Sequence, residues 1–254
     1  MSAAGPARRA LALVDLTELG DSPSPDDIDR LCDRAVGPHG STAAVCVWPR
    51  FATQAVQRLA GTGVAVATVV NFPTGSDDVE ATVAETRRAL DDGVDEIDLV
   101  LPYRSFLAGR IDVATAMVDA VRAEVIPPRR LKVILETGSY PSIESISAAA
   151  RLAIDHGADF VKTSTGKTAV SATPAAVRAM LEAIRDSGRA VGIKPSGGIR
   201  TLDDANAYLA VADEVMGPQW ATPATFRFGA SGLLDALEAA IEGTAPDAAD
   251  TTRY

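Results

Sequence analysis

The sequence predicts one α/β domain in which eight strand–helix units close into a (β/α)8 TIM barrel over residues 1–243. Its length of 254 residues is usual for one such barrel. Short apolar runs alternate with stretches whose apolar residues recur at i, i+3, i+4 and i+7, as strands and amphipathic helices do. The strand runs are continuously apolar, as expected for parallel strands buried on both faces. An open doubly wound sheet is the alternative fold.

The strand candidates recur along the whole chain, and helical patterns separate them. The strands are predicted at Ala10–Leu16, Ala43–Trp48, Val64–Val70, Glu96–Leu101, Leu131–Glu136, Asp159–Ser164, Ala190–Pro195 and Thr225–Phe228. The clearest helical patterns are Asp77–Asp91, Ser142–His156, Thr173–Asp186 and Leu202–Met216. Capping residues such as Thr173 and Thr201, and terminal glycines such as Gly188 and Gly217, support these helices. No linker divides the chain, and 244–254 is expected to be a flexible C-terminal tail.

Composition and charge limit the partners that the protein can have. A net charge of −10 argues against general affinity for nucleic acid or anionic membranes. No run approaches the roughly 18 apolar residues of a transmembrane helix, so no membrane partner is expected. The apolar run that ends at Asp15 is too short for a signal peptide. Cys32 and Cys46 lack metal or redox spacing, so two free thiols in a reducing cytoplasm are expected.

Lysine is scarce in this chain, and its few positions are informative. Of 24 basic residues only four are lysine, namely Lys132, Lys162, Lys167 and Lys194. All four lie in or just after predicted strands, whereas lysines retained by chance would fall mostly on solvent-exposed helix faces. Arginine can neither form a Schiff base nor lose its proton at working pH, but a lysine amine can do both. The lysines therefore mark places where arginine could not serve.

Lys162 is the strongest candidate for a catalytic residue. It lies within the predicted strand 159–164, where burial beside a second cation would lower its pKa and give the free amine that attacks a carbonyl. Lys194 takes the matching place on the next predicted strand, about 4.8 Å away. Asp98, on the predicted strand 96–101, would share an interior layer with Lys162. It is either a proton relay or a structural partner for a buried lysine.

Two glycine-containing loops predict a phosphate site. Pro195–Thr201 follows the seventh predicted strand and opens a helix, and Phe228–Gly232 does the same after the eighth. Small residues let backbone N–H groups approach an anion at a helix N-terminus, and barrels often bind phosphate with these two loops. Gly166 and Lys167 could add a donor from the neighbouring loop. Asp15, near the end of the first predicted strand, would either join the charge network or cap a loop.

Other chemistries lack their motifs. His39 and His156 are the only histidines, so a zinc-dependent enzyme is not expected, and no metal or cofactor is predicted. A Ser-His-Asp hydrolase is not supported, because no Gly-x-Ser-x-Gly elbow with a suitable histidine is present. No Gly-x-Gly-x-x-Gly follows the first strand, which argues against a dinucleotide-binding fold.

The chain resembles the deoxyribose-phosphate aldolase family in segments that run in the right order over nearly its whole length. These segments are 15–17 (DLT), 71–73 (NFP), 96–104 (EIDLVLPYR), 135–138 (LETG), 161–167 (VKTSTGK), 192–201 (GIKPSGGIRT) and 227–231 (RFGAS). The resemblance implies a metal-free class I aldolase that reversibly cleaves 2-deoxy-D-ribose 5-phosphate into acetaldehyde and D-glyceraldehyde 3-phosphate. It also implies that Lys162 forms the Schiff base, that Lys194 lowers its pKa and that Asp98 serves the proton relay.

The resemblance implies the substrate contacts as well. Lys167, with Thr165 and Gly166, would lie on the substrate and phosphate side. The phosphate would be held by Gly197, Gly198, Gly229, Ser231 and Gly232. Close relatives often have a second serine where Gly232 stands, so a hydroxyl is missing here while the backbone N–H remains.

Three further expectations follow from the same resemblance. Cys46 would lie near the pocket as an ordinary thiol. Tyr254 matches a terminal tyrosine that in some relatives reaches the active site during proton transfer. Dimers are common in the family, so a homodimer is the assembly that the resemblance suggests.

Two other functions remain open on the same barrel. A Schiff-base enzyme of transaldolase type would act on a longer sugar phosphate and would take dihydroxyacetone as donor in place of acetaldehyde. A non-catalytic sugar-phosphate sensor would bind without turnover, although the combination of Asp98, Lys162 and Lys194 argues against it.

Overall fold

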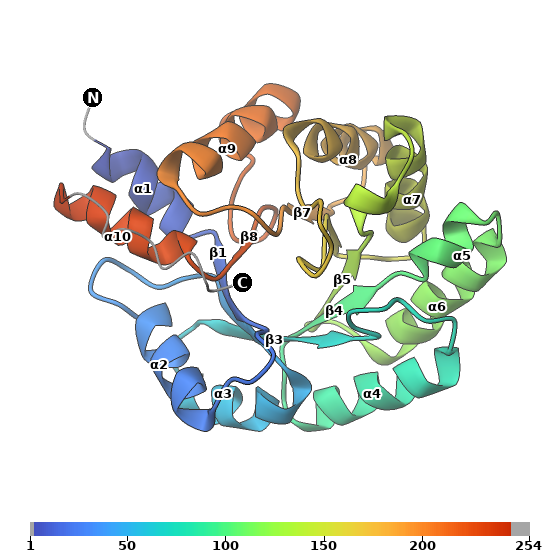
Figure 1. Cartoon of the computed structure of the whole chain (residues 1–254), viewed down its shortest axis with the longest axis horizontal. Coiled ribbons are helices and arrows are strands. Elements are labelled where there is room, and N and C mark those ends of the chain that lie inside the picture. The colour runs from blue at the N-terminus through green and yellow to red at the C-terminus, as the bar shows by residue number, and fades with distance from the viewer. Residues whose placement is uncertain (1–2, 245–254) are drawn as a thin grey trace.

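The computed structural model describes residues 3–244, which form a barrel of parallel strands with helices around it (Figure 1). The strands are β1 (Val14–Glu18), β2 (Ala44–Val47), β3 (Ala65–Val70), β4 (Glu96–Val100), β5 (Arg130–Ile134), β6 (Phe160–Lys162), β7 (Gly192–Lys194) and β8 (Phe228–Ala230). The helices are α1 (Ala4–Leu11), α2 (Pro25–Ala35), α3 (Ala52–Leu59), α4 (Val79–Asp91), α5 (Tyr103–Leu107), α6 (Ile111–Glu124), α7 (Ile143–Asp155), α8 (Pro174–Ser187), α9 (Leu202–Met216) and α10 (Leu233–Glu242). Short 3-10 helices lie at η1 (Pro49–Phe51) and η2 (Thr137–Ser139).

The strands form one sheet in the order β7-β6-β5-β4-β3-β2-β1-β8. Each of these strand pairs is parallel. Parallel bridges between Ile193 and Phe226 and between Ser196 and Gly229 join the two ends of this order. The sheet therefore closes on itself, which confirms the predicted (β/α)8 barrel and excludes the open doubly wound sheet.

The first predicted strand, Ala10–Leu16, is wrong in its first half. Ala10 and Leu11 end helix α1, and β1 begins only at Val14. Residues 4–11 consist mostly of alanine, arginine and leucine, which favour helix. Helix α1 also packs against α9 and α10, so tertiary contacts support the helical conformation.

The eighth predicted strand, Thr225–Phe228, begins too early. The hydroxyl of Thr225 donates to the carbonyl of Trp220, and the amide of Thr225 donates to the carbonyl of Thr222. These bonds hold a turn, so β8 starts at Phe228. The side-chain hydrogen bonds of threonine compete with strand formation in this way.

The helix boundaries agree with the capping signals. Helix α9 spans the predicted Leu202–Met216, and the Thr201 side chain accepts a hydrogen bond from the Asp204 amide at its start. Thr173 caps α8 in the same manner, and Gly188 ends that helix with a positive φ of 66°. Local chemistry therefore sets these boundaries.

Alternation along the strands separates an apolar outer layer from a polar interior. In β4, Ile97 and Leu99 belong to the hydrophobic core between strands and helices, whereas Asp98 contacts lysines of other strands. Gly192 makes room for one aromatic side chain in the interior, because a Cβ there would lie 2.3 Å from the Phe160 ring. The interior is thus the part of the barrel that holds charged groups.

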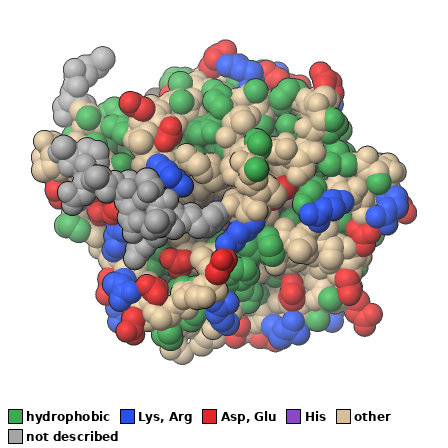
Figure 2. All heavy atoms as spheres, viewed as in Figure 1, with side chains coloured by type: hydrophobic (Ala, Val, Ile, Leu, Met, Phe, Trp, Pro, Cys, Tyr) green, Lys and Arg blue, Asp and Glu red, His purple; other side chains and the backbone are tan. Residues whose placement is uncertain are grey.

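Within residues 3–244, no helix is long and apolar enough to cross a membrane. On the face shown in Figure 2, acidic and basic side chains are interspersed and do not gather in one patch of a single sign. The predicted C-terminal tail lies outside the described residues from 245 onward.

Candidate active site

A column of buried charged side chains fills the interior of the barrel. Its cations are Lys132, Lys162, Lys194 and Arg227, and its anions are Asp15, Glu96 and Asp98. Each of these side chains is at most 4% exposed. Charges removed from water require partners, so the pairing within the column determines which groups keep their protons.

Lys162 and Lys194 end neighbouring strands in matching register. The Nζ atoms of both lysines lie 2.8 Å from the same oxygen, Oδ2 of Asp98. The proximity predicted for the two lysines and for Asp98 is therefore confirmed. The Lys162 side chain is 4% exposed and that of Lys194 is 0% exposed, so Lys162 is the less enclosed of the two lysines.

The three interior lysines differ in the number of carboxylates that surround them. Lys132 contacts Glu96 and Asp98, each at 2.7 Å, and has Asp15 at 3.6 Å. Lys194 contacts Asp15 at 2.6 Å and Asp98 at 2.8 Å. Lys162 contacts Asp98 alone, at 2.8 Å. Because all three are buried, this difference in carboxylates decides their acidity.

The pKa values of the three lysines follow the number of carboxylates around each. Burial lowers the pKa of Lys162, and the Lys194 charge lowers it further, so that Asp98 does not restore the ordinary value. Burial also disfavours the charged forms of Lys194 and Lys132, but their carboxylate neighbours outweigh it and raise both pKa values. Lys162 is thus the interior lysine of lowered pKa, as a nucleophilic amine requires.

Asp98 is held in its ionised form. Burial alone would raise the pKa of its carboxyl group, but Lys132, Lys162 and Lys194 together hold it well below the usual range. A carboxylate that touches two amines at 2.8 Å can accept a proton from one and return it to a bound intermediate.

The charge count agrees with one neutral lysine in the column. The column has four cations if Lys162 is protonated, against the three anions Asp15, Glu96 and Asp98. Loss of the proton from Lys162 makes the column neutral. Net charge in a buried cluster is costly, so neutrality favours the free amine at Lys162.

Asp15 joins the charge network, which decides between the two alternatives for this residue. Its carboxylate lies 2.6 Å from Lys194 Nζ and 2.6 Å from Arg227 Nη1. Burial would raise the pKa of Asp15, but Lys194 and Arg227 lower it well below its usual value. Asp15 therefore supplies the second anion that keeps Lys194 charged.

Cys46 lies on β2 and is fully buried among Leu19, Ala67 and Val69. Burial raises the pKa of its thiol, which keeps the sulfur protonated. A protonated thiol is a poor nucleophile, in agreement with an ordinary thiol near the site.

The two predicted phosphate loops lie side by side. The Gly197 amide donates to the Gly229 carbonyl at 3.4 Å, and the Gly229 amide donates to the Pro195 carbonyl at 2.9 Å. A Cβ at Gly229 would lie 2.2 Å from Ser196 Oγ and 3.1 Å from Lys194 Cε, so only glycine fits there. Gly198 has a φ of 78° and open space where a Cβ would be.

The two helices that follow these loops begin differently. At the start of α9 the Asp204 side chain accepts from the amides of Arg200 and Thr201, so these donors are already used. Helix α10 begins at Gly232 without a side-chain cap, and a Cβ there would meet open space. The α10 end is therefore the better place for an anion.

Glu136 organises the loop that carries Thr165, Gly166 and Lys167. It has a positive φ of 61° and is fully buried. Its carboxylate accepts from the Thr165 hydroxyl at 2.5 Å and from the Thr168 hydroxyl at 3.1 Å. The substrate contacts predicted for Thr165, Gly166 and Lys167 stay predictions. Lys167 Nζ lies 3.3 Å from the exposed Asp21 on the loop after β1.

Several residues of the site were not predicted from the sequence. Lys132 was noted as a scarce lysine without a role, and Glu96 and Arg227 were only part of resembling segments. Glu136 is the last residue of the predicted strand Leu131–Glu136 and part of the resembling segment 135–138, but no role was predicted for it. Tyr254 lies outside the described residues. Among residues 3–244, no three His, Cys, Asp or Glu side chains are arranged to hold a metal ion.

A parallel (β/α)8 barrel with a buried amine of lowered pKa beside one carboxylate has the arrangement that a lysine-dependent Schiff-base enzyme requires. A family model described as DeoC/LacD family aldolase matches residues 9–238. The deoxyribose-phosphate aldolase of Agrobacterium fabrum (strain C58 / ATCC 33970) is 51% identical over 237 residues, which cover 93% of this chain and 92% of that protein. The chain therefore belongs to the DeoC/LacD aldolase family.

Solved structures agree with this assignment. The apo-form crystal structure of a Toxoplasma gondii ME49 protein, provisionally assigned as a deoxyribose-phosphate aldolase, is 27% identical with a TM-score of 0.86. It matches over 95% of this chain and 98% of that chain. The tetrameric deoxyribose phosphate aldolase of Aeropyrum pernix is 23% identical with a TM-score of 0.73, over 92% of this chain and 91% of that chain. At that identity the second likeness shows the fold alone.

Proposed function

We propose that this aldolase reversibly cleaves 2-deoxy-D-ribose 5-phosphate to acetaldehyde and D-glyceraldehyde 3-phosphate through a Schiff base on Lys162. One observation carries the proposal: Lys162 Nζ lies 2.8 Å from the Asp98 oxygen that Lys194 also contacts. A cation that shares the carboxylate weakens its hold on the Lys162 proton, which leaves a free amine. The relative from Agrobacterium fabrum supports the choice of substrate.

The reaction follows from the position of this amine. Lys162 adds to the aldehyde carbon C1 of the open-chain sugar, and Asp98 relays the protons needed to expel water and form an iminium. The iminium accepts the electron pair of the C2–C3 bond while the C3 hydroxyl loses its proton, which releases D-glyceraldehyde 3-phosphate. The enamine that remains takes a proton at C2, and hydrolysis then releases acetaldehyde and the amine.

We assign the phosphate to the two adjoining loops. Gly198 and Gly232 both face open space, so backbone N–H groups can approach an anion there. Gly197, Gly229 and Ser231 would complete the cradle, with Lys167 as the nearby cation. The uncapped start of α10 favours negative charge and compensates in part for the hydroxyl missing at Gly232.

Borohydride trapping tests the proposal. The protein is incubated with 2-deoxyribose 5-phosphate, reduced, and analysed by intact mass and peptide mapping. A reduced adduct on the peptide that contains Lys162 is expected. The Lys167→Arg variant is the matched control and should retain this adduct, because Lys167 lies outside the charge column. An adduct on Lys167 or Lys194 would overturn the assignment of Lys162.

A comparison of donors separates the proposal from a transaldolase-type enzyme. Acetaldehyde with D-glyceraldehyde 3-phosphate should give product, and dihydroxyacetone in its place should not. Saturable binding of sugar phosphate without turnover would instead identify a sensor. The homodimer and the cytoplasmic location stay predictions, to be checked by light scattering and by cell fractionation.

A further inference from the structure

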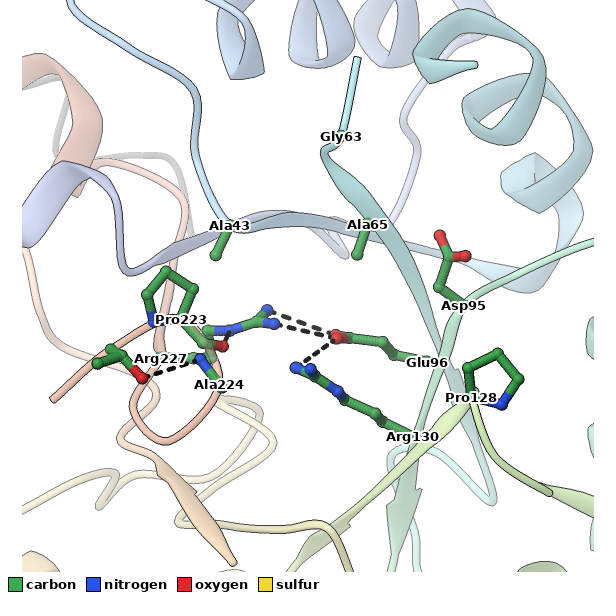
Figure 3. Close-up of a pocket in the computed structure, with 11 residues that line it drawn as sticks. Ala43, Gly63, Ala65, Asp95, Glu96, Pro128, Arg130, Pro223, Ala224 and Arg227 are labelled. Carbon is green, nitrogen blue, oxygen red and sulfur yellow. Dashed lines mark hydrogen bonds and ion pairs between the residues drawn. The ribbon is translucent and has the colours of Figure 1, made fainter. Parts of the chain in front are cut away.

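The charge column continues to the amino-terminal end of the barrel, far from the open side of Lys162. Glu96 is the first residue of β4, and Arg227 directly precedes β8. Both side chains line a pocket of about 490 Å³, together with Arg130 and with small residues such as Ala43 and Gly63 (Figure 3). The carboxylate of Glu96 and the guanidinium of Arg227 point towards each other in this pocket.

The guanidinium group of Arg227 makes hydrogen bonds through all three of its nitrogen atoms. Its Nη1 donates to Asp15 Oδ1 at 2.6 Å, its Nη2 donates to Glu96 Oε1 at 3.1 Å, and its Nε donates to the Pro223 carbonyl. Its side chain is only 3% exposed. A buried arginine with this many bonds holds both carboxylates in fixed positions.

A chain of ion pairs links Arg227 to Lys162. Asp15 touches Arg227 through Oδ1 and Lys194 through Oδ2, each at 2.6 Å. Lys194 and Lys162 then share Asp98 Oδ2 at 2.8 Å. With every member buried, water screens these charges little, so a change at one end alters the potential at the other.

We propose that Arg227, with Glu96, is a positioning residue that keeps the Lys162 amine in its neutral form from the opposite end of the barrel. This inference rests on the proposed function, because it concerns the amine that forms the Schiff base. With Arg227 present, the column is neutral only if Lys162 lacks its extra proton. Without Arg227, the three lysines balance Asp15, Glu96 and Asp98, and neutrality requires protonated Lys162.

The groups that face Lys162 are known for every element around it. Asp98 approaches from β4, Lys194 from β7 and Cys46 from β2. Farther along the column lie Asp15 on β1 and Lys132 on β5, followed by Glu96 and Arg227. Within this set, Arg227 and Glu96 do not contact Lys162, Lys194 or Cys46, so they can be exchanged without removing a group that contacts Lys162.

The test measures kcat/KM as a function of pH for Arg227→Gln and Glu96→Gln and compares the acid limbs, where activity falls as pH is lowered. That limb reports ionisation of the free enzyme, here the loss of the Lys162 proton. Arg227→Gln should move it up by about one pH unit, and Glu96→Gln should move it down by a similar amount. The double variant Arg227→Gln/Glu96→Gln restores the charge balance and should return the limb to its original place.

Opposite shifts distinguish a charge effect from a packing effect. Loss of packing would lower activity in both variants without moving the limb in opposite directions. Shifts of the same sign, or no shift, would overturn the proposal. If Arg227→Gln does not fold, Glu96→Gln and Arg227→Lys decide the question, since the lysine keeps the charge and should leave the limb within about 0.3 unit of its original place.

Arg130 provides the matched control. It lines the same pocket and lies 3.7 Å from Glu96, but its side chain is 38% exposed. Water screens that charge, so Arg130→Gln should not move the limb. An equal shift in Arg130→Gln and Arg227→Gln would count against a special role of Arg227.

Failure of the proposed function gives a different result. Wild-type protein that yields no trapped adduct on Lys162 would refute the Schiff base itself. If the wild type forms the adduct on Lys162, the Schiff base stands. If Arg227→Gln and Glu96→Gln then show the same pH dependence as the wild type, only the role of Arg227 and Glu96 is refuted.

Discussion

Lys162 and Lys132 lie on neighbouring strands of one barrel and are both buried, yet their pKa values move in opposite directions. Lys132 has three carboxylates within 3.6 Å, and these overcome the effect of burial and raise its pKa. Lys162 has Asp98 alone and must share it with Lys194, so its pKa is lowered. Burial therefore lowers the pKa of a lysine only where too few carboxylates are present to offset it.

The two ends of the charge column differ in the same way. At the amino-terminal end, Lys132 and Arg227 are held by Glu96 in a closed set of ion pairs. At the reacting end, Lys162 and Lys194 share one oxygen of Asp98. The first arrangement stabilises the barrel interior, and the second provides the nucleophilic amine. Substitution by methionine should therefore have different effects at Lys132 and at Lys162.

Lys162→Met should have the largest effect on activity. Without an amine no Schiff base forms, and kcat for 2-deoxyribose 5-phosphate cleavage should fall by about 10⁴-fold or more, measured with a coupled aldehyde assay. The free energy of unfolding should change by no more than about 1 kcal/mol, because the remaining column is neutral. Near-normal turnover would refute the proposed mechanism.

Lys132→Met should instead act on stability. The substitution removes a cation that both Glu96 and Asp98 contact, and these carboxylates are buried. The free energy of unfolding should therefore fall by about 3–5 kcal/mol. Urea denaturation of this variant beside Lys162→Met provides the measurement, and the two substitutions control for each other. Equal destabilisation in both would contradict the contrast between the two lysines.

Lys194→Met should shift the pH dependence of the reaction. The charge of Lys194 helps to lower the pKa of Lys162, so its loss should move the acid limb of kcat/KM up by about one unit. Activity on the acid side of the profile should fall about tenfold, and it should recover at pH values above the shifted limb. Lys167→Met is the control: it should raise KM without moving the limb. A loss that persists at every pH would indicate a different role for Lys194.

The smallest expected effect is on stability as a function of pH. The folded-state pKa of Lys162 lies below the unfolded value, so the folded protein binds fewer protons in that window and gains stability as pH rises. The wild type should therefore gain stability relative to Lys162→Met as pH rises from the folded-state pKa of Lys162 towards the unfolded value of about 10.4, by about 1.4 kcal/mol for each unit by which that pKa is lowered. Denaturation curves at a series of pH values in this range measure the difference in the free energy of unfolding between the two proteins. A difference that does not change with pH would show that Lys162 stays charged when folded.

Local signals in the sequence were sufficient for the four helices with the clearest patterns and for the candidate amine. Thr173 and Thr201 mark helix starts by capping chemistry that acts within four residues. The first and eighth strands were misplaced because tertiary packing of α1 and the Thr225 turn override apolar patterning. Glu136 could not be recognised, because its role depends on a hydroxyl 29 residues away.

Patterns along the chain were enough to predict eight strand–helix units, lysines in or just after the strands, and the proximity of Lys162, Lys194 and Asp98. Only the tertiary structure decided that Asp15 completes the network and that Arg227, 212 residues along the chain, binds it. The physical reason is that periodicity acts over a few residues, whereas the number of carboxylates around an amine depends on the register in which distant strands close. That number decides which buried lysine loses its proton.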